Sequence, residues 1–198
     1  MKRIPIIIDC DPGTDDAMAI LLANACGRYD MRAITAVAGN VELEHTAANA
    51  LALAAYYGID TVVAQGADRP MVIGQKIAPE WHGNNGMGGF EFPPHDKKLD
   101  ERWAWDVIYD EAKKFPGEIV LFAVGPMTNV ALAIKKYPKL REYLKRIIIM
   151  GGSATVGNHS QYAEFNIWVD PHAMDIVLKS GIPITMVGLN VTQQAYIT

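Results

Sequence analysis

The chain has 198 residues, of which half are hydrophobic and a fifth are charged, and its formal net charge is −4. This length suits a single domain, residues 1–198, whose core is stable without disulfides or structural metals. The acidic balance disfavours nucleic acid as a partner, because a polyanion needs a basic surface. Two cysteines are too few for a disulfide framework, and we expect neither a signal peptide nor a membrane span. The composition therefore predicts a soluble, reduced, cytoplasmic protein.

Short apolar runs alternate with helical patterns along the chain. Strands are predicted where β-branched residues form a short run, and helices where apolar residues recur every three or four positions. The predicted strands cover residues 4–8, 31–38, 61–64, 118–124, 146–150 and 184–189, and the predicted helices cover residues 15–26, 44–57, 103–115, 127–136 and 171–179. Nearly all-apolar strands that alternate with helices predict an α/β fold, in which an open, mainly parallel sheet carries helices on both faces.

One long segment, residues 66–98, breaks this alternation. It is rich in Gly, Pro and Asn, and residues 82–89 at its centre read HGNNGMGG. A segment of this length without periodicity is uncommon in a compact domain and is usually functional or disordered.

Four carboxylates, those of Asp9, Asp11, Asp15 and Asp16, fall within eight residues at the end of the first predicted strand. Carboxylates this close repel one another unless a cation lies among them, and oxygen ligands indicate a hard cation, Ca²⁺ or Mg²⁺. The carboxyl ends of strands are also where open α/β sheets bind their ligands. The alternative is an N-cap followed by an acidic first helical turn, which explains Asp15 and Asp16 but leaves Asp9 and Asp11 without a role.

Other polar residues follow the later strands and should reach the same edge of the sheet. They are Gly39-Asn40, the run Val124–Asn129, Met150-Gly151-Gly152, Gly157-Asn158 and the run Ala163–Asn166. Each motif alone is weak evidence for a binding site, since Gly-Asn is a common turn and Thr128-Asn129 can cap a helix. Glu164 and Asn166 alternate about Phe165, so both can face one side of an extended segment. Carboxylates and amides without Lys or Arg suit a neutral, hydroxyl-rich ligand such as a sugar better than a phosphate.

The residues 9–16, DCDPGTDD, match the DxDPGxDD signature of the nucleoside hydrolases, and the whole chain resembles this family of inosine–uridine-preferring N-ribohydrolases. The later polar motifs match in order and spacing, as does the strand Met186–Leu189. The resemblance implies a Rossmann-like nucleoside hydrolase fold and hydrolysis of the N-glycosidic bond of ribonucleosides to ribose and free base. It also implies a Ca²⁺ cofactor that activates the water, and we expect a homo-oligomer, either a dimer or a tetramer.

The resemblance also implies roles for individual residues. Asp11 and Asp16 would bind Ca²⁺ through their carboxylates, and Val124 through its backbone carbonyl. Asp11, in contact with both metal and water, is the natural general base. The ribose hydroxyls would be held by Asp15, Asn40, Asn158, Glu164 and Asn166, with Met150 packed under the sugar. His82 would lie near the nucleobase, although a surface-loop histidine is nearly as good an explanation.

The family pattern continues past the last predicted strand, with a His-Asp pair that assists the leaving base and completes the metal shell. The residues 1–198 lack it, because His95-Asp96 stands at the wrong place in the order. We therefore expect the C-terminal part of the family fold to be absent, and very low turnover. The alternatives are an impaired or inactive form that binds nucleoside or ribose, and a phosphoryl-transfer enzyme. The latter is disfavoured because Pro12 follows the second aspartate and no suitable downstream lysine motif is present.

Overall fold

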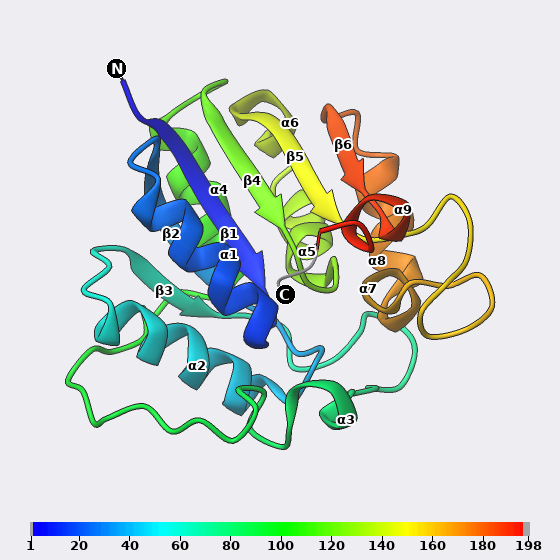
Figure 1. Ribbon diagram of the computed structural model, residues 1–198. Helices are drawn as coiled ribbons and strands as arrows, with labels where there is room; N and C mark the ends of the chain where they lie inside the picture. The colour runs from blue at the N-terminus through cyan, green and yellow to red at the C-terminus, as the bar shows by residue number, and fades with distance from the viewer. Residues whose placement is uncertain (1, 196–198) are drawn as a thin grey trace.

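A six-stranded, entirely parallel sheet forms the centre of the computed structural model, which describes residues 2–195 (Figure 1). The order of the strands across the sheet is β3-β2-β1-β4-β5-β6. The strands are β1 (Ile4–Cys10), β2 (Tyr29–Ala36), β3 (Val62–Gln65), β4 (Ile119–Ala123), β5 (Leu144–Met150) and β6 (Ile184–Val187). This order reverses between β1 and β4, and such a reversal opens a crevice at the carboxyl ends of the two strands.

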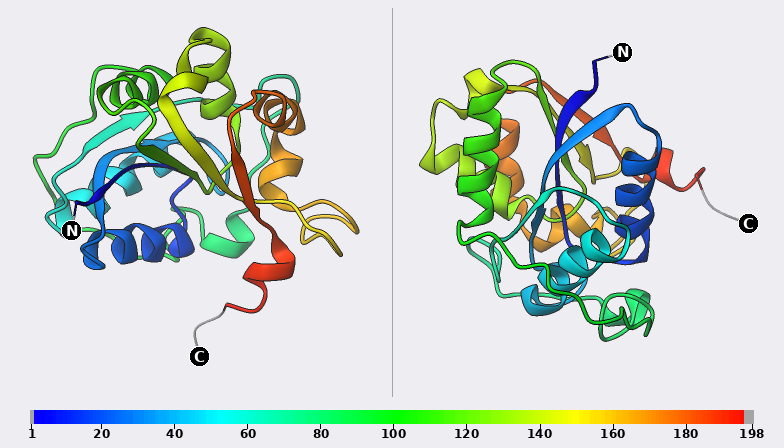
Figure 2. Two further views of the ribbon diagram at one scale, coloured as in Figure 1. Left: turned by 90° about the horizontal axis from the view of Figure 1, so that it is seen from above. Right: turned by 90° about the vertical axis from the view of Figure 1, so that its left-hand side faces the viewer.

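Helices cover both faces of the sheet, as the two turned views show (Figure 2). On one face, α1 (Thr14–Ala25) and α2 (Leu43–Tyr56) pack against β2. On the other face lie α4 (Ala104–Lys114), α5 (Thr128–Lys136) and α8 (Pro171–Leu178), and α5 contacts both of its neighbours. Shorter helices complete the chain: α3 (Pro79–His82), α6 (Leu140–Tyr143), α7 (Phe165–Val169) and α9 (Leu189–Thr192).

The core has two parts, one on each face of the sheet, because successive side chains of a strand point in opposite directions. In β1, Ile7 packs with α4 and α5, whereas Ile6 and Ile8 pack with α1 and α2. All three side chains are almost fully buried, which explains the continuous apolar run that predicted a parallel strand. Within residues 2–195 no helix combines the length and apolarity that crossing a membrane requires.

The predicted α/β class and parallel sheet are confirmed, while several boundaries differ from the prediction. β1 runs two residues further than expected, because Asp9 and Cys10 continue the parallel pairing with Thr35 and Ala36. The segment 66–98 contains the short helix α3, and α6 precedes β5. Four- and five-residue helices are too short to show an apolar period, so the sequence pattern misses them.

Candidate active site

A cavity of about 610 Å³ opens at the carboxyl ends of the strands, beside the reversal point between β1 and β4. Every site residue predicted from the sequence lines it. These are Asp11, Asp15, Asp16, Asn40, His82, Val124, Met150, Asn158, Glu164 and Asn166. The parallel fold therefore brings residues from the ends of several strands and helices into one space, which is large enough for a small ligand.

Asp11 lies at the floor of the cavity and is held from several sides. Its Oδ2 accepts a hydrogen bond of 2.7 Å from the backbone N–H of Asn40, and the Asn40 side chain donates to the carbonyl of Asp11 at 3.0 Å. A Cβ atom at Gly39 or Gly125 would overlap the Asp11 carboxylate. Both glycines are therefore needed so that backbone can approach this carboxylate closely from two sides.

The first turn of α1 supplies the next two carboxylates. Asp16 is buried, and its Oδ2 accepts the N–H of Gly13 at 3.0 Å, which closes the start of the helix. Asp15 lies at the cavity rim with 77% of its side chain exposed. The capping interpretation therefore holds for Asp16, but it does not account for Asp11, whose carboxylate bonds outside the helix.

Burial makes the charged form of these carboxylates costly. It raises the pKa of Asp16 to about 8, with a further contribution from the neighbouring charge of Asp15. Burial, followed by the charge of Asp16, also raises the pKa of Asp11 well above its usual range. Across residues 2–195, no Lys, Arg or His forms an ion pair with Asp9, Asp11 or Asp16.

Asp9 lies behind Asp11 and Asp16 and does not line the cavity. Its Oδ1 accepts hydrogen bonds from Thr35 at 2.5 Å and from Asn129 at 2.8 Å, while its buried Oδ2 has no partner within the described residues. Burial raises the pKa of Asp9 to about 7, although both hydrogen bonds lower it. A helix cap was one possible role for Thr128-Asn129, but Met127 is the N-cap of α5, and Asn129 instead donates to Asp9.

The opposite wall is built around Glu164 and Asn166. The predicted extended segment is wrong here: Glu164 is the N-cap of α7, and its carboxylate accepts the N–H groups of Asn166 and Ile167. The first N–H groups of a helix have no partner within the helix, and the Glu164 carboxylate accepts two of them. The side chain of Asn166 donates to the carbonyls of Val124 at 2.9 Å and Met150 at 3.1 Å, and thereby joins the ends of β4 and β5.

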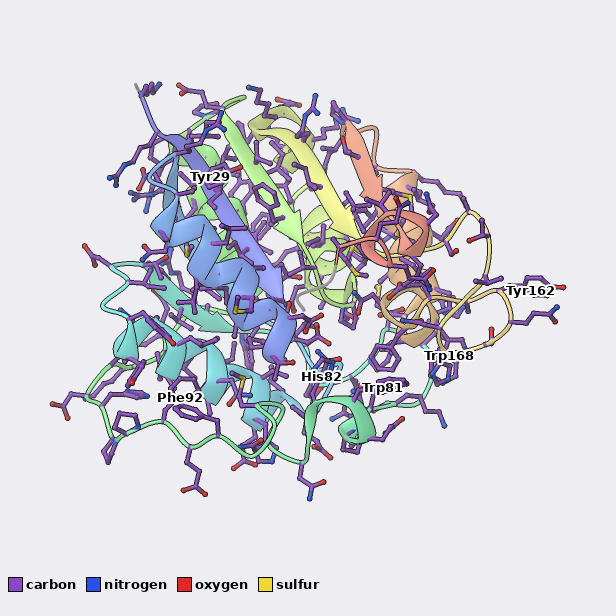
Figure 3. The ribbon with its side chains drawn as sticks, in the orientation of Figure 1. Tyr29, Trp81, His82, Phe92, Tyr162 and Trp168 are labelled. Atoms are coloured by element: carbon purple, nitrogen blue, oxygen red, sulfur yellow. The ribbon has the colours of Figure 1, made fainter. Side chains whose placement is uncertain are left out.

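Asn158 and His82 complete the predicted set. Asn158 is exposed, and its Oδ1 accepts the N–H of Phe165 at 2.9 Å. His82 ends α3 and lies beside the start of α1 (Figure 3). Its Nδ1 lies 3.4 Å from the Thr14 hydroxyl and 3.9 Å from Asp15 Oδ1. Its side chain is 17% exposed and lines the cavity, which favours a role in the site over a surface-loop histidine.

The sequence reasoning did not select His159, which also lines the cavity and whose ring centroid lies 3.6 Å from that of Trp168. A single histidine in a loop carries no pattern that could have identified it. Trp81 and Phe165 line the same region, and α9 contributes Thr192. This part of the cavity is more apolar than the part around Asp11.

The oxygen atoms that line the cavity meet some, but not all, of the requirements of a Ca²⁺ site. Asp11, Asp16 and Val124 line one cavity, and carboxylate and carbonyl oxygens suit Ca²⁺, while the Val124 carbonyl also accepts the Asn166 amide. The buried carboxylates of Asp11 and Asp16, which have no cationic partner among residues 2–195, fit a site that a cation would neutralise. Ca²⁺ takes six to eight oxygens, and in the described part of the chain no three His, Cys, Asp or Glu side chains gather as a metal site.

Known proteins share both the sequence and the fold. The profile of the inosine-uridine preferring nucleoside hydrolases matches residues 6–198. A non-specific ribonucleoside hydrolase, RihC, of Escherichia coli is 44% identical over 196 residues, which are 99% of this chain and 64% of that protein. A plant nucleoside hydrolase superposes with a TM-score of 0.95 at 37% identity, over all of this chain and 63% of its own.

A purine-preferring ribonucleoside hydrolase from Gardnerella vaginalis gives a TM-score of 0.94 at 36% identity, over 98% of this chain and 63% of its own. The chain thus spans just under two thirds of the length of the relatives it matches. Sequence profile, curated relative and solved structures agree, and the chain belongs to the inosine-uridine preferring nucleoside hydrolase family.

Proposed function

We propose that this chain hydrolyses the N-glycosidic bond of ribonucleosides to ribose and free base. The observation that carries the proposal is that one cavity is lined by the buried carboxylates of Asp11, after β1, and Asp16, on α1, and also by the polar groups at the start of α7. A ribose ring presents hydroxyl groups, each of which donates one hydrogen bond and accepts others, so a mixed lining of this kind suits it. The names of the relatives support the same reaction.

In this proposal the sugar lies between the two walls. Asp15 and Glu164 accept hydrogen bonds from ribose hydroxyls, and the side-chain amides of Asn40, Asn158 and Asn166 donate to them or accept from them. Met150 packs against the ring. The nucleobase then extends toward His82 and the more apolar region around Trp81.

Asp11, Asp16 and the Val124 carbonyl would hold Ca²⁺, and water would supply its remaining ligands. When bound, the ion would lower the pKa of a water molecule and neutralise the buried carboxylates. Asp11 would take a proton from the attacking water as its oxygen forms a bond to the anomeric carbon of ribose. The carbon–nitrogen bond breaks, and its electron pair leaves with the nucleobase, which gains a proton from solvent water, while Asp11 returns the proton that it took to solvent. The carboxylates of Asp15 and Glu164, which would not bind the ion, favour the oxocarbenium-like sugar in between.

A second candidate is binding of nucleoside or ribose with little turnover. It is favoured because, within residues 2–195, no third acidic or histidine side chain joins Asp11 and Asp16 as a metal ligand. A looser metal and an unassisted leaving group would both slow the chemistry, whereas the groups that hold ribose would be unaffected.

The test incubates the chain with inosine or uridine and Ca²⁺, and measures released ribose and bound nucleoside. Ribose release that is lost in Asp11→Asn and on chelation, but kept in the exposed control Asp60→Asn, would support hydrolysis. Binding without release would favour the second candidate, and neither binding nor release would refute both. Release of phosphate from a generic phosphate ester would instead indicate the phosphoryl-transfer alternative.

The cytoplasmic location stays a prediction. We also propose that the chain forms a homo-oligomer. An apolar groove of about 380 Å³ between α1 and β4 supports self-association, because exposed apolar surface of this kind is unfavourable in water. Light scattering at several concentrations would test it, and a constant monomer mass would contradict it.

A further inference from the structure

Asn49 lies in the middle of α2, is 8% exposed and is not one of the residues assigned above to metal or ribose. Its side-chain NH₂ group donates to two carbonyls that belong to different segments. One is the carbonyl of Pro12, at 3.2 Å, in the turn between Asp11 and α1. The other is the carbonyl of Asn85, at 2.8 Å, in the glycine-rich segment 82–89. A single amide therefore ties the turn that presents the carboxylates to the segment that presents His82.

Hydrogen bonds within residues 82–89 link Asn85 to His82. Asn85 organises the segment from within, since its Oδ1 accepts the N–H groups of Met87 and Gly89, both at 3.0 Å. The N–H of Gly88 donates to the carbonyl of His82 at 2.7 Å, and the N–H of Gly86 donates to Gly83 at 3.0 Å. The segment is thus a closed, hydrogen-bonded unit, and fixing Asn85 fixes the backbone of His82.

Gly86 shows how closely this unit fits against α2. Its φ is +78°, which disfavours residues with a Cβ, and an added Cβ would lie 2.9 Å from Asn49 Nδ2 and 3.2 Å from the Pro12 carbonyl. At the other end of the unit, the His82 ring lies so near the Gly13 backbone that a Cβ there would be 2.7 Å from Nδ1. The imidazole is therefore set against the turn after Asp11.

We infer that Asn49 is a positioning residue that holds His82 over the Asp11–Asp16 turn through its two hydrogen bonds. The inference rests on the proposed function only for what His82 does to a substrate, because the placement itself can be measured without one. Two carbonyls facing each other repel unless donors lie between them, and the side-chain NH₂ of Asn supplies one hydrogen to each. Asp and Leu have nearly the same shape as Asn but supply no such donor.

The test compares Asn49→Asp and Asn49→Leu with Asn24→Asp and Asn24→Leu, matched controls on the exposed face of α1. Amide hydrogen exchange is followed in the chain without substrate. Both Asn49 variants should exchange about 5- to 100-fold faster in residues 83–89, the range expected for losing one or two buried hydrogen bonds, while the strands keep the rate of the controls. The NMR signals of the His82 ring, assigned with His82→Gln, should shift in the Asn49 variants alone.

Unchanged exchange in residues 83–89, or faster exchange in every strand, would overturn the inference. The second result would mean that Asn49 supports only overall stability. If the Asn49 variants do not fold, Gly86→Ala disturbs the same contact from the side of the segment 82–89. Its control is Gly74→Ala, because an added Cβ at Gly74 meets nothing within 4 Å. A third result is faster exchange in residues 83–89 of the Asn49 variants while the unmodified chain releases no ribose. That result would refute the proposed hydrolysis but would still support the placement of His82 by Asn49.

Discussion

The side-chain amide of Asn129 lies 2.8 Å from Oδ1 of Asp9, although 120 positions separate the two residues in the sequence. The same amide group donates to the carbonyl of Ala36 at 3.0 Å, and its oxygen accepts the N–H of Ala67 at 2.8 Å. One buried side chain at the start of α5 therefore connects the ends of β1 and β2 and the loop after β3. This arrangement fixes the strand ends from which the cavity is built.

We predict that Asn129→Leu destabilises the chain by about 1–3 kcal/mol, because it leaves Asp9 Oδ1 with one donor fewer and two buried backbone groups unpaired. Urea unfolding would measure the change. Asn24→Leu is the exposed control and should alter the unfolding free energy by less than about 0.5 kcal/mol. Equal effects of the two substitutions would show that the Asn129 network contributes nothing.

In the absence of metal, the unfolding free energy should fall as the pH rises from about 5 to 8. The folded chain holds protons on Asp9 and Asp16, with pKa values of about 7 and about 8, whereas the usual value is 3.8. Between these values the folded state binds more protons than the unfolded state, so stability decreases with rising pH.

Thermal unfolding with a chelator, at pH 5 and at pH 8, would measure this decrease. Asp16→Asn should reduce it, because it removes one of the two groups, and should raise the melting temperature at pH 8. Added Ca²⁺ should restore stability at pH 8 by binding the ionised form. A stability that is constant or rises over this range would contradict the proposed burial of uncompensated carboxylates.

Gly39→Ala should weaken Ca²⁺ binding by about 10–100-fold, the usual effect of disturbing a group that orients a metal ligand. The reason is steric, since the new Cβ would overlap the carboxylate of Asp11 and displace it from the Asn40 N–H. Titration calorimetry would measure the affinity. Gly74→Ala, where the added Cβ meets nothing within 4 Å, is the control, and equal affinities in both variants would refute the argument.

The sequence predicted the position of Asp11 and Asp16 well because a strand, a Pro-Gly turn and a helix start are all local patterns. It also predicted that loops after different strands converge, since parallel strands end at one edge of the sheet. It could not predict the partners of Asn129 or Asn49, because a buried amide gives no periodic signal and its partners lie far along the chain. Alternation about Phe165 wrongly indicated an extended segment where the Glu164 carboxylate caps a helix.

Glu164 has two separable roles, one in the fold and one in the proposed chemistry. Its Oε2 accepts the N–H groups of Gly152 at 3.0 Å and Ile167 at 3.2 Å, and its Oε1 accepts that of Asn166 at 3.0 Å. Glu164→Ala removes this cap and should cost about 0.5–2 kcal/mol of stability. Glu164→Gln keeps an acceptor oxygen for part of the cap, so its effect on unfolding by urea should be smaller.

The charge of Glu164 should matter more for turnover than for folding. Glu164→Gln removes one negative charge from the wall that faces the developing oxocarbenium, and ribose release should fall about 10²-fold, the scale of losing one preorganised charge-stabilising group. Initial rates of ribose release from inosine with saturating Ca²⁺, measured beside urea unfolding of the same preparations, would separate the two roles. If Glu164→Gln released ribose as fast as the unmodified chain while Glu164→Ala lost stability, Glu164 would be a helix cap alone. The negative charge needed at the sugar would then have to come from Asp11 and Asp15 on the other wall.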